Sequence, residues 1–275
     1  MANDEKLLHF LYDTVPGRLL LRPLVGRTVS RLAGRFLDTG LSKPLIKPFL
    51  RAGNIDLSEY LPEEYGCFND CFTRRIKPEL RPLPEDPAVL MAPCDGRLTV
   101  LPVTGGAIFP VKQSRFTLAD LLGSTDLARP FRGGMCLVFR LCVDDYHRYC
   151  YFDDGVKGKN VFLPGKLHTV RPVALAAVPV FTENCREYTL MQTAHFGLAA
   201  QIEVGAMLVG RIENRDGPGP VRRGAEKGRF LYGGSTVIVL LRKNAAVLDP
   251  AILEASGQGR ETKVRMGQAI GRASV

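Results

Sequence analysis

The sequence predicts an α+β fold, with a largely antiparallel β core and a helical N-terminal region. From Val89 onward, short apolar runs are separated by glycine-containing turns, a pattern typical of consecutive antiparallel strands. Before residue 61, apolar side chains recur instead at the spacing of helical turns. A hydrophobic content of 45% and a charged content of 24% are ordinary for a globular protein of 275 residues.

Residues 1–60 are predicted to be mostly helical, with breaks at Pro16, Pro23, Pro44 and Pro48. Arg27, Arg31 and Arg35 recur every four residues and form one stripe of a helix, and the other side carries Val25, Val29, Leu32 and Phe36. Two interpretations fit this pattern. The helix lies on anionic lipid, or it packs on the core with its arginines in water.

Residues 61–275 are predicted to form a β-rich domain that begins with a proline-dotted connector from Leu61 to Pro87. The polar, glycine-containing stretch from Gly257 to Val275 predicts a mobile tail. The strands expected between them are Arg97–Val103, Met135–Val143, Ala176–Phe181, Tyr188–Thr193, Ala199–Val204, Met207–Ile212 and Thr236–Arg242.

A formal net charge of +9 admits nucleic acid, an anionic membrane surface or plain solubility as its explanation. No aromatic-basic ladder, zinc-finger pattern or RNA-recognition signature is present, so we expect no nucleic-acid partner. No run of eighteen apolar residues exists, and the start lacks the order of a secretory signal, so neither a transmembrane segment nor a signal peptide is expected.

The seven cysteines are an odd number scattered through a mid-sized chain, which fits a reducing compartment better than a disulfide framework. Cys67 and Cys71 have no second closely spaced pair of ligands, so no metal site is expected. The sequence does not decide between a monomer and a homodimer.

The tetrapeptide Gly233-Gly234-Ser235-Thr236 immediately precedes the apolar run 237–241. Glycine tolerates strained backbone angles, which would let the Ser235 hydroxyl attack the Gly234 carbonyl. An N-to-O acyl shift followed by β-elimination would then break the chain and leave a pyruvoyl group at the new N-terminus. Alone the tetrapeptide is weak evidence, because most Gly-Ser pairs are turns.

A second Gly-Ser-Thr occurs at Gly123-Ser124-Thr125. The preceding Thr117-Leu-Ala-Asp predicts a capped short helix with Gly123 at its C-terminal end. No buried strand follows, so Ser124 is expected to be structural.

Six blocks of the chain, in order from about Leu57 to Leu241, resemble the phosphatidylserine decarboxylases. They are Asn69–Pro78 with Arg81-Pro82, Ala92–Arg97, Asp145–Tyr149, Glu183–Glu187, Val204–Gly210 and Gly224–Thr236. The resemblance implies a proenzyme that cleaves itself between Gly234 and Ser235 into parts 1–234 and 235–275. Its pyruvoyl group, derived from Ser235, would form a Schiff base with phosphatidylserine, releasing CO2 and phosphatidylethanolamine. It also implies a peripheral protein on the cytoplasmic face of the cell membrane.

The resemblance assigns catalytic roles to Asp95, His147 and Ser235. His147 would take the serine proton, because the charge of a histidine changes near neutral pH, and Asp95 would orient and stabilise the imidazolium. Without the resemblance, Asp95-Gly96 predicts a turn. His147 would then be interpreted as a core histidine whose hydrogen bonds are made within the protein.

One position departs from the family, which often has a second histidine three residues after the first. Here that position is Cys150, so the role of the second histidine cannot be transferred. His168 is the alternative base and, with Tyr146, a candidate for substrate binding. His9 and His195 are weaker candidates.

Three other functions stay open at this point. A pyruvoyl-dependent decarboxylase of a soluble amino acid would share the chemistry. A serine hydrolase using Asp95, His147 and Ser235 lacks the Gly-X-Ser-X-Gly turn around Ser235. A lipid-binding scaffold with a decayed cleavage site would fit Cys150 but not the intact tetrapeptide.

Overall fold

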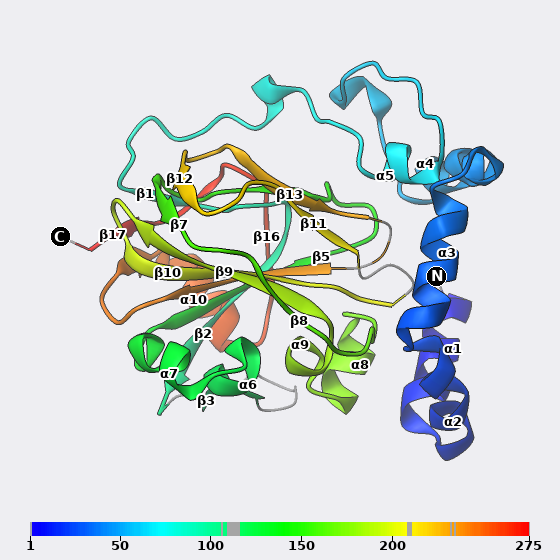
Figure 1. Cartoon of the computed structure of the whole chain (residues 1–275), viewed down its shortest axis with the longest axis horizontal. Coiled ribbons are helices and arrows are strands. Elements are labelled where there is room, and N and C mark those ends of the chain that lie inside the picture. Colours follow the sequence, from blue (N-terminus) through cyan, green and yellow to red (C-terminus); the bar gives the residue numbers. More distant parts are fainter. Residues whose placement is uncertain are drawn as a thin grey trace.

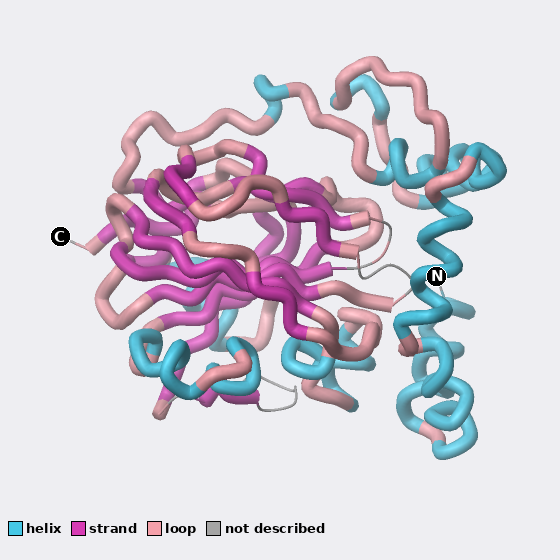
Figure 2. Tube along the Cα trace, viewed as in Figure 1, coloured by secondary structure: helices cyan, strands magenta, loops and turns pink. Residues whose placement is uncertain are grey.

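The computed structural model describes residues 2–105, 107–108, 116–207, 211–231, 233 and 235–274. The fold is α+β, as predicted, with strands at the centre and helices outside them (Figure 2). None of the described helices is both long enough and apolar enough to cross a bilayer.

The N-terminal region is helical, as predicted, but the expected breaks at Pro23, Pro44 and Pro48 are wrong, because these residues lie within helical elements. Thr14 begins α2 by accepting a hydrogen bond from the Gly17 backbone at 3.1 Å, and Pro16 lies in the first turn, where no intrahelical N–H is needed. Figure 1 shows α1, α2 and α3 stacked along one end of the molecule. The bounds are α1 (Ala2–Asp13), α2 (Val15–Leu24), α3 (Arg27–Leu37), η1 (Gly40–Leu45) and α4 (Ile46–Ala52).

The connector from Leu61 to Pro87 is mainly irregular, but it contains one short buried helix. This helix, α5 (Phe68–Phe72), places Phe68, Cys71 and Phe72 in the interior. Two 3₁₀ turns flank it, η2 (Leu57–Glu59) and η3 (Pro78–Leu80).

The main sheet has eleven antiparallel strands among the described residues. β14 lies near its middle and is buried along its whole length, which explains its unbroken apolar sequence. The order is β12 (Gly219–Val221), β7 (Gly155–Lys157), β9 (Arg186–Thr193), β10 (Gly197–Val204), β14 (Ser235–Leu241), β5 (Met135–Leu141), β2 (Gly96–Thr104), β3 (Ala107–Ile108) and β4 (Phe116–Thr117). Two further strands pair off this path, β16 (Thr262–Val264) with β2 and β8 (Val161–Leu163) with β9.

Two small sheets cover one face of the main sheet, and Figure 1 shows β11 and β13 above it. Val237, Val239 and Leu241 point into the core on this side. One sheet is β1 (Val89–Met91), β17 (Ala269–Ala273) and β15 (Ala246–Leu248), and the other is β11 (Ile212–Asn214), β13 (Glu226–Phe230) and β6 (Arg148–Cys150).

Helices cover the opposite face, where Ile238 and Leu240 share an apolar cluster with Leu21 and Val25 of the N-terminal region. The first 60 residues and the sheet therefore share one core; the division at residue 60 stays a prediction. The helices are α6 (Leu118–Leu122), α7 (Thr125–Ala128), η4 (Arg129–Phe131), α8 (Pro172–Ala177) and α9 (Val180–Glu183), while α10 (Pro250–Gly257) packs on β2.

Four of the predicted strands correspond to β2, β5, β9 and β10, and a fifth to β14. The strand expected at Ala176–Phe181 is wrong, because this segment contains the end of α8 and the start of α9. Pro179, which begins α9, is compatible with a helix start, and alanine is a good helix former. Of the strand expected at Met207–Ile212, residues 208–210 lie outside the described residues, and β11 begins at Ile212.

The mobile tail expected at residues 257–275 is also wrong for the described part. β16 pairs with β2, and β17 lies between β1 and β15. The polar residues of these strands are compatible with their position at the surface, where one side of a strand can remain in water.

The second Gly-Ser-Thr is structural, as predicted. Gly123 ends α6 in the left-handed conformation with φ of 68°, and the Ser124 hydroxyl caps α7 by accepting a hydrogen bond from the Leu127 backbone at 3.4 Å.

The three arginines of α3 are exposed, as the packed alternative expects, and the Arg27 guanidinium lies 5.5 Å from the centre of the Phe162 ring on β8. Val25, just before the helix, is buried in the core, whereas Leu32 and Phe36 are 60% and 45% exposed. The packed alternative therefore holds for the arginines and Val25 and is wrong for Leu32 and Phe36.

Candidate active site

Ser235 is the first residue of β14 and is almost completely buried. Its Oγ has no hydrogen-bond partner within the described part of the chain. A buried hydroxyl without a partner is costly, which makes Ser235 a candidate functional residue. Gly233, two residues before Ser235, has φ of 136°, a backbone angle that side chains disfavour. Gly234, the other half of the predicted cleavage site, lies outside the described residues.

His147 lies just before β6 and is fully buried against Phe72, with ring centres 4.2 Å apart. Its Nδ1 is 2.8 Å from the Asp145 carbonyl oxygen. Because a carbonyl can only accept, Nδ1 carries the proton in the neutral ring and the lone pair is on Nε2. Nε2 is buried and has no partner of good geometry among the described residues.

Burial lowers the pKa of His147 to about 3, and the backbone groups of Asp145 and Gly233 oppose this shift only in part. The imidazole is therefore neutral at physiological pH. Its Nε2 lone pair can accept a proton, and burial shelters the ring from water.

Asp95 is buried, but its partner is Arg81 rather than His147. The guanidinium donates from Nε at 2.8 Å and from Nη2 at 2.5 Å, one bond to each carboxylate oxygen. The Met266 backbone donates a third bond at 2.8 Å. Among the described residues no hydrogen bond joins Asp95 to His147, so the predicted Asp-His contact is not present.

The sheet register nevertheless brings Asp95 and Ser235 to the same end of the sheet. Arg140 on β5 pairs with Arg97 on β2 and with Thr236 on β14, so both candidates lie just beyond this row. A Cβ at Gly96 would stand 2.9 Å from the Arg140 carbonyl oxygen. The glycine after Asp95 thus permits the close approach of β2 and β5. The Asp-Gly dipeptide alone predicted only a turn.

Asp95 also lies near the segment that orients His147. Burial raises the pKa of the Asp145 carboxyl, and the negative charges of Asp144 and Asp95 raise it further. Asp145 is the residue whose carbonyl accepts from His147. The Asp95 carboxylate is thus close enough to Asp145 for the two charges to interact.

Cys150, at the position of the family's second histidine, faces the Asp95 segment. Its thiol donates to the Pro93 carbonyl at 3.4 Å. Burial raises the pKa of this thiol to about 12, so it stays protonated and does not replace a histidine as a base.

His168 is buried and already has neighbours at both ring nitrogens. Nδ1 lies 3.2 Å from the Tyr12 hydroxyl and Nε2 lies 3.6 Å from the Glu183 carboxylate, too far for a hydrogen bond. Burial lowers its pKa. The Asn184 amide connects it to the sheet by donating to the carbonyls of His168 and Gly205 at 2.8 and 2.7 Å.

Tyr146 packs with Tyr60 and Ile76 in a small apolar cluster. Burial raises the pKa of its phenol to about 12. His9 is paired with Asp13 on the surface, and His195 with the buried Asp153 at 2.8 Å. The substrate-binding role of Tyr146 stays a prediction.

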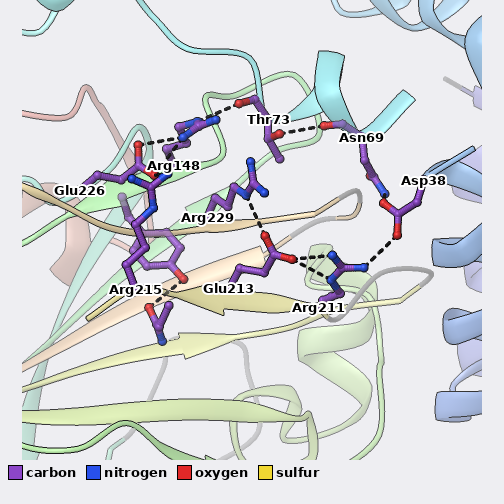
Figure 3. A network of polar contacts seen from close by, with 11 residues as sticks. Asp38, Asn69, Thr73, Arg148, Arg211, Glu213, Arg215, Glu226 and Arg229 are labelled. Carbon is purple, nitrogen blue, oxygen red and sulfur yellow. Dashed lines mark hydrogen bonds and ion pairs between the residues drawn. The ribbon is translucent and has the colours of Figure 1, made fainter. Parts of the chain in front are cut away.

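A polar network, drawn in Figure 3, anchors α5 at its C-terminal end. This helix carries Phe72, which packs on His147. Arg148, next to His147, donates to the Thr73 carbonyl at 2.7 Å and pairs with Glu226 at 2.9 Å. The other half of the network joins the end of α3 to β11 and β13. It consists of Asp38, Asn69, Arg211, Glu213 and Arg229.

Sequence reasoning did not assign roles to Arg81, Asp145 and Phe72. Arg81 stands in the Arg-Pro dipeptide of a recognised block, which is a signal for it. The contacts of Phe72 and of the Asp145 carbonyl depend on segments far apart in sequence or on backbone geometry, and no pattern in the sequence marks them.

The chain was compared with known families and proteins. The family model described as phosphatidylserine decarboxylase matches residues 68–272. The chain is 40% identical to phosphatidylserine decarboxylase proenzyme 2 of Clostridium acetobutylicum, over 97% of this chain and 92% of that protein. Identity is 39% to the proenzyme of Ruminiclostridium cellulolyticum, over 97% and 91% of the two chains, and 38% to that of Clostridium botulinum strain Langeland, over 97% and 92%. With the match covering both the Ser235 and the Asp95–His147 segments, the chain belongs to the phosphatidylserine decarboxylase family.

Proposed function

We propose that this chain is a phosphatidylserine decarboxylase proenzyme that cleaves itself between Gly234 and Ser235 and converts Ser235 to a pyruvoyl group. The observation that carries the proposal is the buried, unpartnered Ser235 hydroxyl at the start of a central strand. The proenzyme names of the relatives support it.

In the proposed cleavage, the Ser235 Oγ attacks the Gly234 carbonyl carbon while His147 Nε2 takes the hydroxyl proton. The peptide C–N bond breaks and an ester joins the two parts. Loss of the Ser235 α-proton then breaks the bond between Cβ and Oγ of Ser235, which releases the Gly234 carboxylate and leaves a dehydroalanine. Water hydrolyses the imine form of this residue, and its nitrogen leaves as ammonia.

The surroundings of Ser235 fit the group that this sequence of steps would form. Its backbone pairs with Leu141 on β5, and the next residue, Thr236, pairs with both β5 and β10, so the new N-terminus stays in place after the cut. When present, a pyruvoyl group supplies a ketone that binds a primary amine and withdraws electrons from the bond to the departing carboxylate. His147 returns the proton that replaces CO2, and Phe72 shields its ring from water.

Asp95 is proposed to act by charge, held by Arg81. A buried carboxylate near the Asp145 segment stabilises the imidazolium that forms whenever His147 holds a proton.

The N-terminal region supports a lipid substrate and a peripheral position on a membrane. Most large apolar side chains exposed at the surface lie here, among them Leu7, Val15, Leu19, Leu20, Leu32, Phe36 and Leu41. Exposed apolar side chains gathered in one region mark a contact surface, and the basic residues among them favour anionic lipid. A decarboxylase of a soluble amino acid would need no such surface.

Denaturing mass spectrometry of Ser235→Ala, Ser124→Ala and the wild type tests the cleavage. We expect the wild type and Ser124→Ala to give a fragment 235–275 that is about 17 Da lighter than the serine-initiated peptide, the mass of ammonia. Ser235→Ala should stay intact and inactive on phosphatidylserine. A Ser235→Ala protein that still cleaves and decarboxylates would refute the mechanism.

A further inference from the structure

A cavity of about 340 Å³ lies between α3 and the strands β8 and β11. Four arginines line it: Arg27, Arg31 and Arg35 from one side of α3, and Arg211 from the segment before β11. Phe162, Leu167 and Ile212 contribute apolar surface. One part of the cavity wall is therefore cationic and another part is apolar.

Three of the four positive charges are not neutralised. Arg211 pairs with Asp38 at 2.8 Å and with Glu213 at 2.5 Å. Arg27, Arg31 and Arg35 have no carboxylate partner within the part of the chain whose side chains are described. An anion in the cavity would find unpaired guanidinium groups.

A buried hydroxyl in the lining also lacks a partner. Ser30, between Arg27 and Arg31 on α3, is 6% exposed, and its Oγ makes no hydrogen bond among the described residues. A ligand oxygen would remove the cost of this unpaired group.

Backbone pairing between neighbouring strands connects the lining of this cavity to the active site along two paths. The backbone carbonyl of Cys185, a lining residue, accepts from the Gly205 N–H at 2.9 Å, and the adjacent Val204 pairs with Thr236. Cys185 is thus two strands from Ser235, or about 10 Å. Ile212 pairs with Phe230, whose backbone donates to the His147 carbonyl at 2.9 Å.

We propose that this cavity binds the phosphodiester of the lipid substrate and so positions its serine amine for residue 235. The inference rests on the proposed function. Guanidinium groups match phosphate oxygens in charge and forked geometry, Ser30 donates to a phosphate oxygen, and the apolar wall receives the glycerol and the first acyl carbons. The serine headgroup, ester-linked to this phosphate, extends toward Ser235.

Labelling with the arginine reagent phenylglyoxal tests binding without using activity. Glycerophospho-L-serine is the probe, and L-serine, which lacks the phosphate, is the control. We expect the probe to protect the peptides carrying Arg31 and Arg35, while the peptide carrying Arg51 reacts equally with and without it. Equal labelling of all three arginines, or stronger protection by inorganic phosphate than by the probe, would overturn the assignment.

Kinetics on phosphatidylserine vesicles test the positioning. Arg31→Gln/Arg35→Gln should raise KM about tenfold or more, the effect of losing charged hydrogen bonds, and leave self-cleavage complete. The matched control Arg22→Gln/Arg51→Gln removes two exposed charges of the N-terminal region outside the cavity and should raise KM less than the cavity variant does, because it removes surface charge without removing a phosphate contact. Equal effects of the two double variants would show that surface charge alone acts, and would overturn the proposal.

The two experiments separate the two proposals. If the probe protects Arg31 and Arg35 but the processed protein does not decarboxylate phosphatidylserine, the cavity assignment holds and the proposed function fails. If decarboxylation proceeds without protection, the function holds and the cavity assignment fails.

Discussion

His147 combines full burial with one directed hydrogen bond, and the two together determine how it can react. The bond to the Asp145 carbonyl keeps the proton on Nδ1, and burial keeps the ring neutral. A neutral imidazole with a free Nε2 is ready to accept a proton, whereas Cys150 is a protonated thiol and His168 is packed against Tyr12 and Glu183.

This pKa shift predicts how stability changes with pH. The pKa of His147 is about 3 in the folded protein and about 6.5 in the unfolded chain. Between these values the unfolded chain binds the extra proton, so the free energy of unfolding should fall as pH falls through this window, by up to about 1.4 kcal/mol per pH unit.

Chemical denaturation of the Ser235→Ala proenzyme at several pH values measures this dependence. The same series on Ser235→Ala/His147→Gln is the control and should show a shallower fall. Equal slopes for the two proteins would mean that His147 is not buried in its neutral form.

Arg81 and Asp95 form a pair with side chains only 7% and 11% exposed. Arg81→Leu would leave a buried carboxylate without its main partner and should lower the free energy of unfolding by about 3–5 kcal/mol. Chemical denaturation measures this loss, and Arg272→Leu, which breaks an exposed pair with Asp86, should cost less than about 1 kcal/mol. Similar losses in the two variants would contradict a buried pair.

At the scale of elements, α3 lines a cavity with its exposed arginines and also exposes Leu32 and Phe36. If these two side chains enter a bilayer, Leu32→Gln/Phe36→Gln should weaken binding to phosphatidylserine vesicles. Each apolar side chain contributes about 1.5–3 kcal/mol when fully buried, so the partition coefficient should fall at least tenfold.

Vesicle flotation measures the partition. The control Val247→Gln/Leu253→Gln changes two exposed apolar residues in β15 and α10, which are 64% and 42% exposed. A similar fall in both double variants would show that α3 has no special part in membrane binding.

At the scale of the whole molecule, the proposed cut would leave the parts 1–234 and 235–275 interlocked. β14 is held between β10 and β5, β16 pairs with β2, and β17 lies between β1 and β15. We expect the two fragments to elute together in size-exclusion chromatography under native conditions and to separate only in denaturant. Native elution of a free small fragment would contradict this arrangement.

The sequence was sufficient for much of this fold and for the identity of the candidate residues. Alternating apolar runs with glycine turns predicted β2, β5, β9, β10 and β14, because strand periodicity is a local property. The segment Ala176–Phe181 was misread, since a short apolar run does not distinguish a strand from a helix by periodicity alone. The C-terminal strands were missed because they depend on partners far away in the chain.

By itself, the sequence determined the family, the α+β class and the choice of Ser235, His147 and Asp95, because these depend on local patterns and motif order. Only the tertiary structure decided that Arg81 holds Asp95, that the Asp145 carbonyl directs His147, and that α3 turns its arginines toward a cavity. Each of these contacts joins different elements or depends on backbone placement, and burial, which shifts the pKa of His147, exists only once the chain has folded.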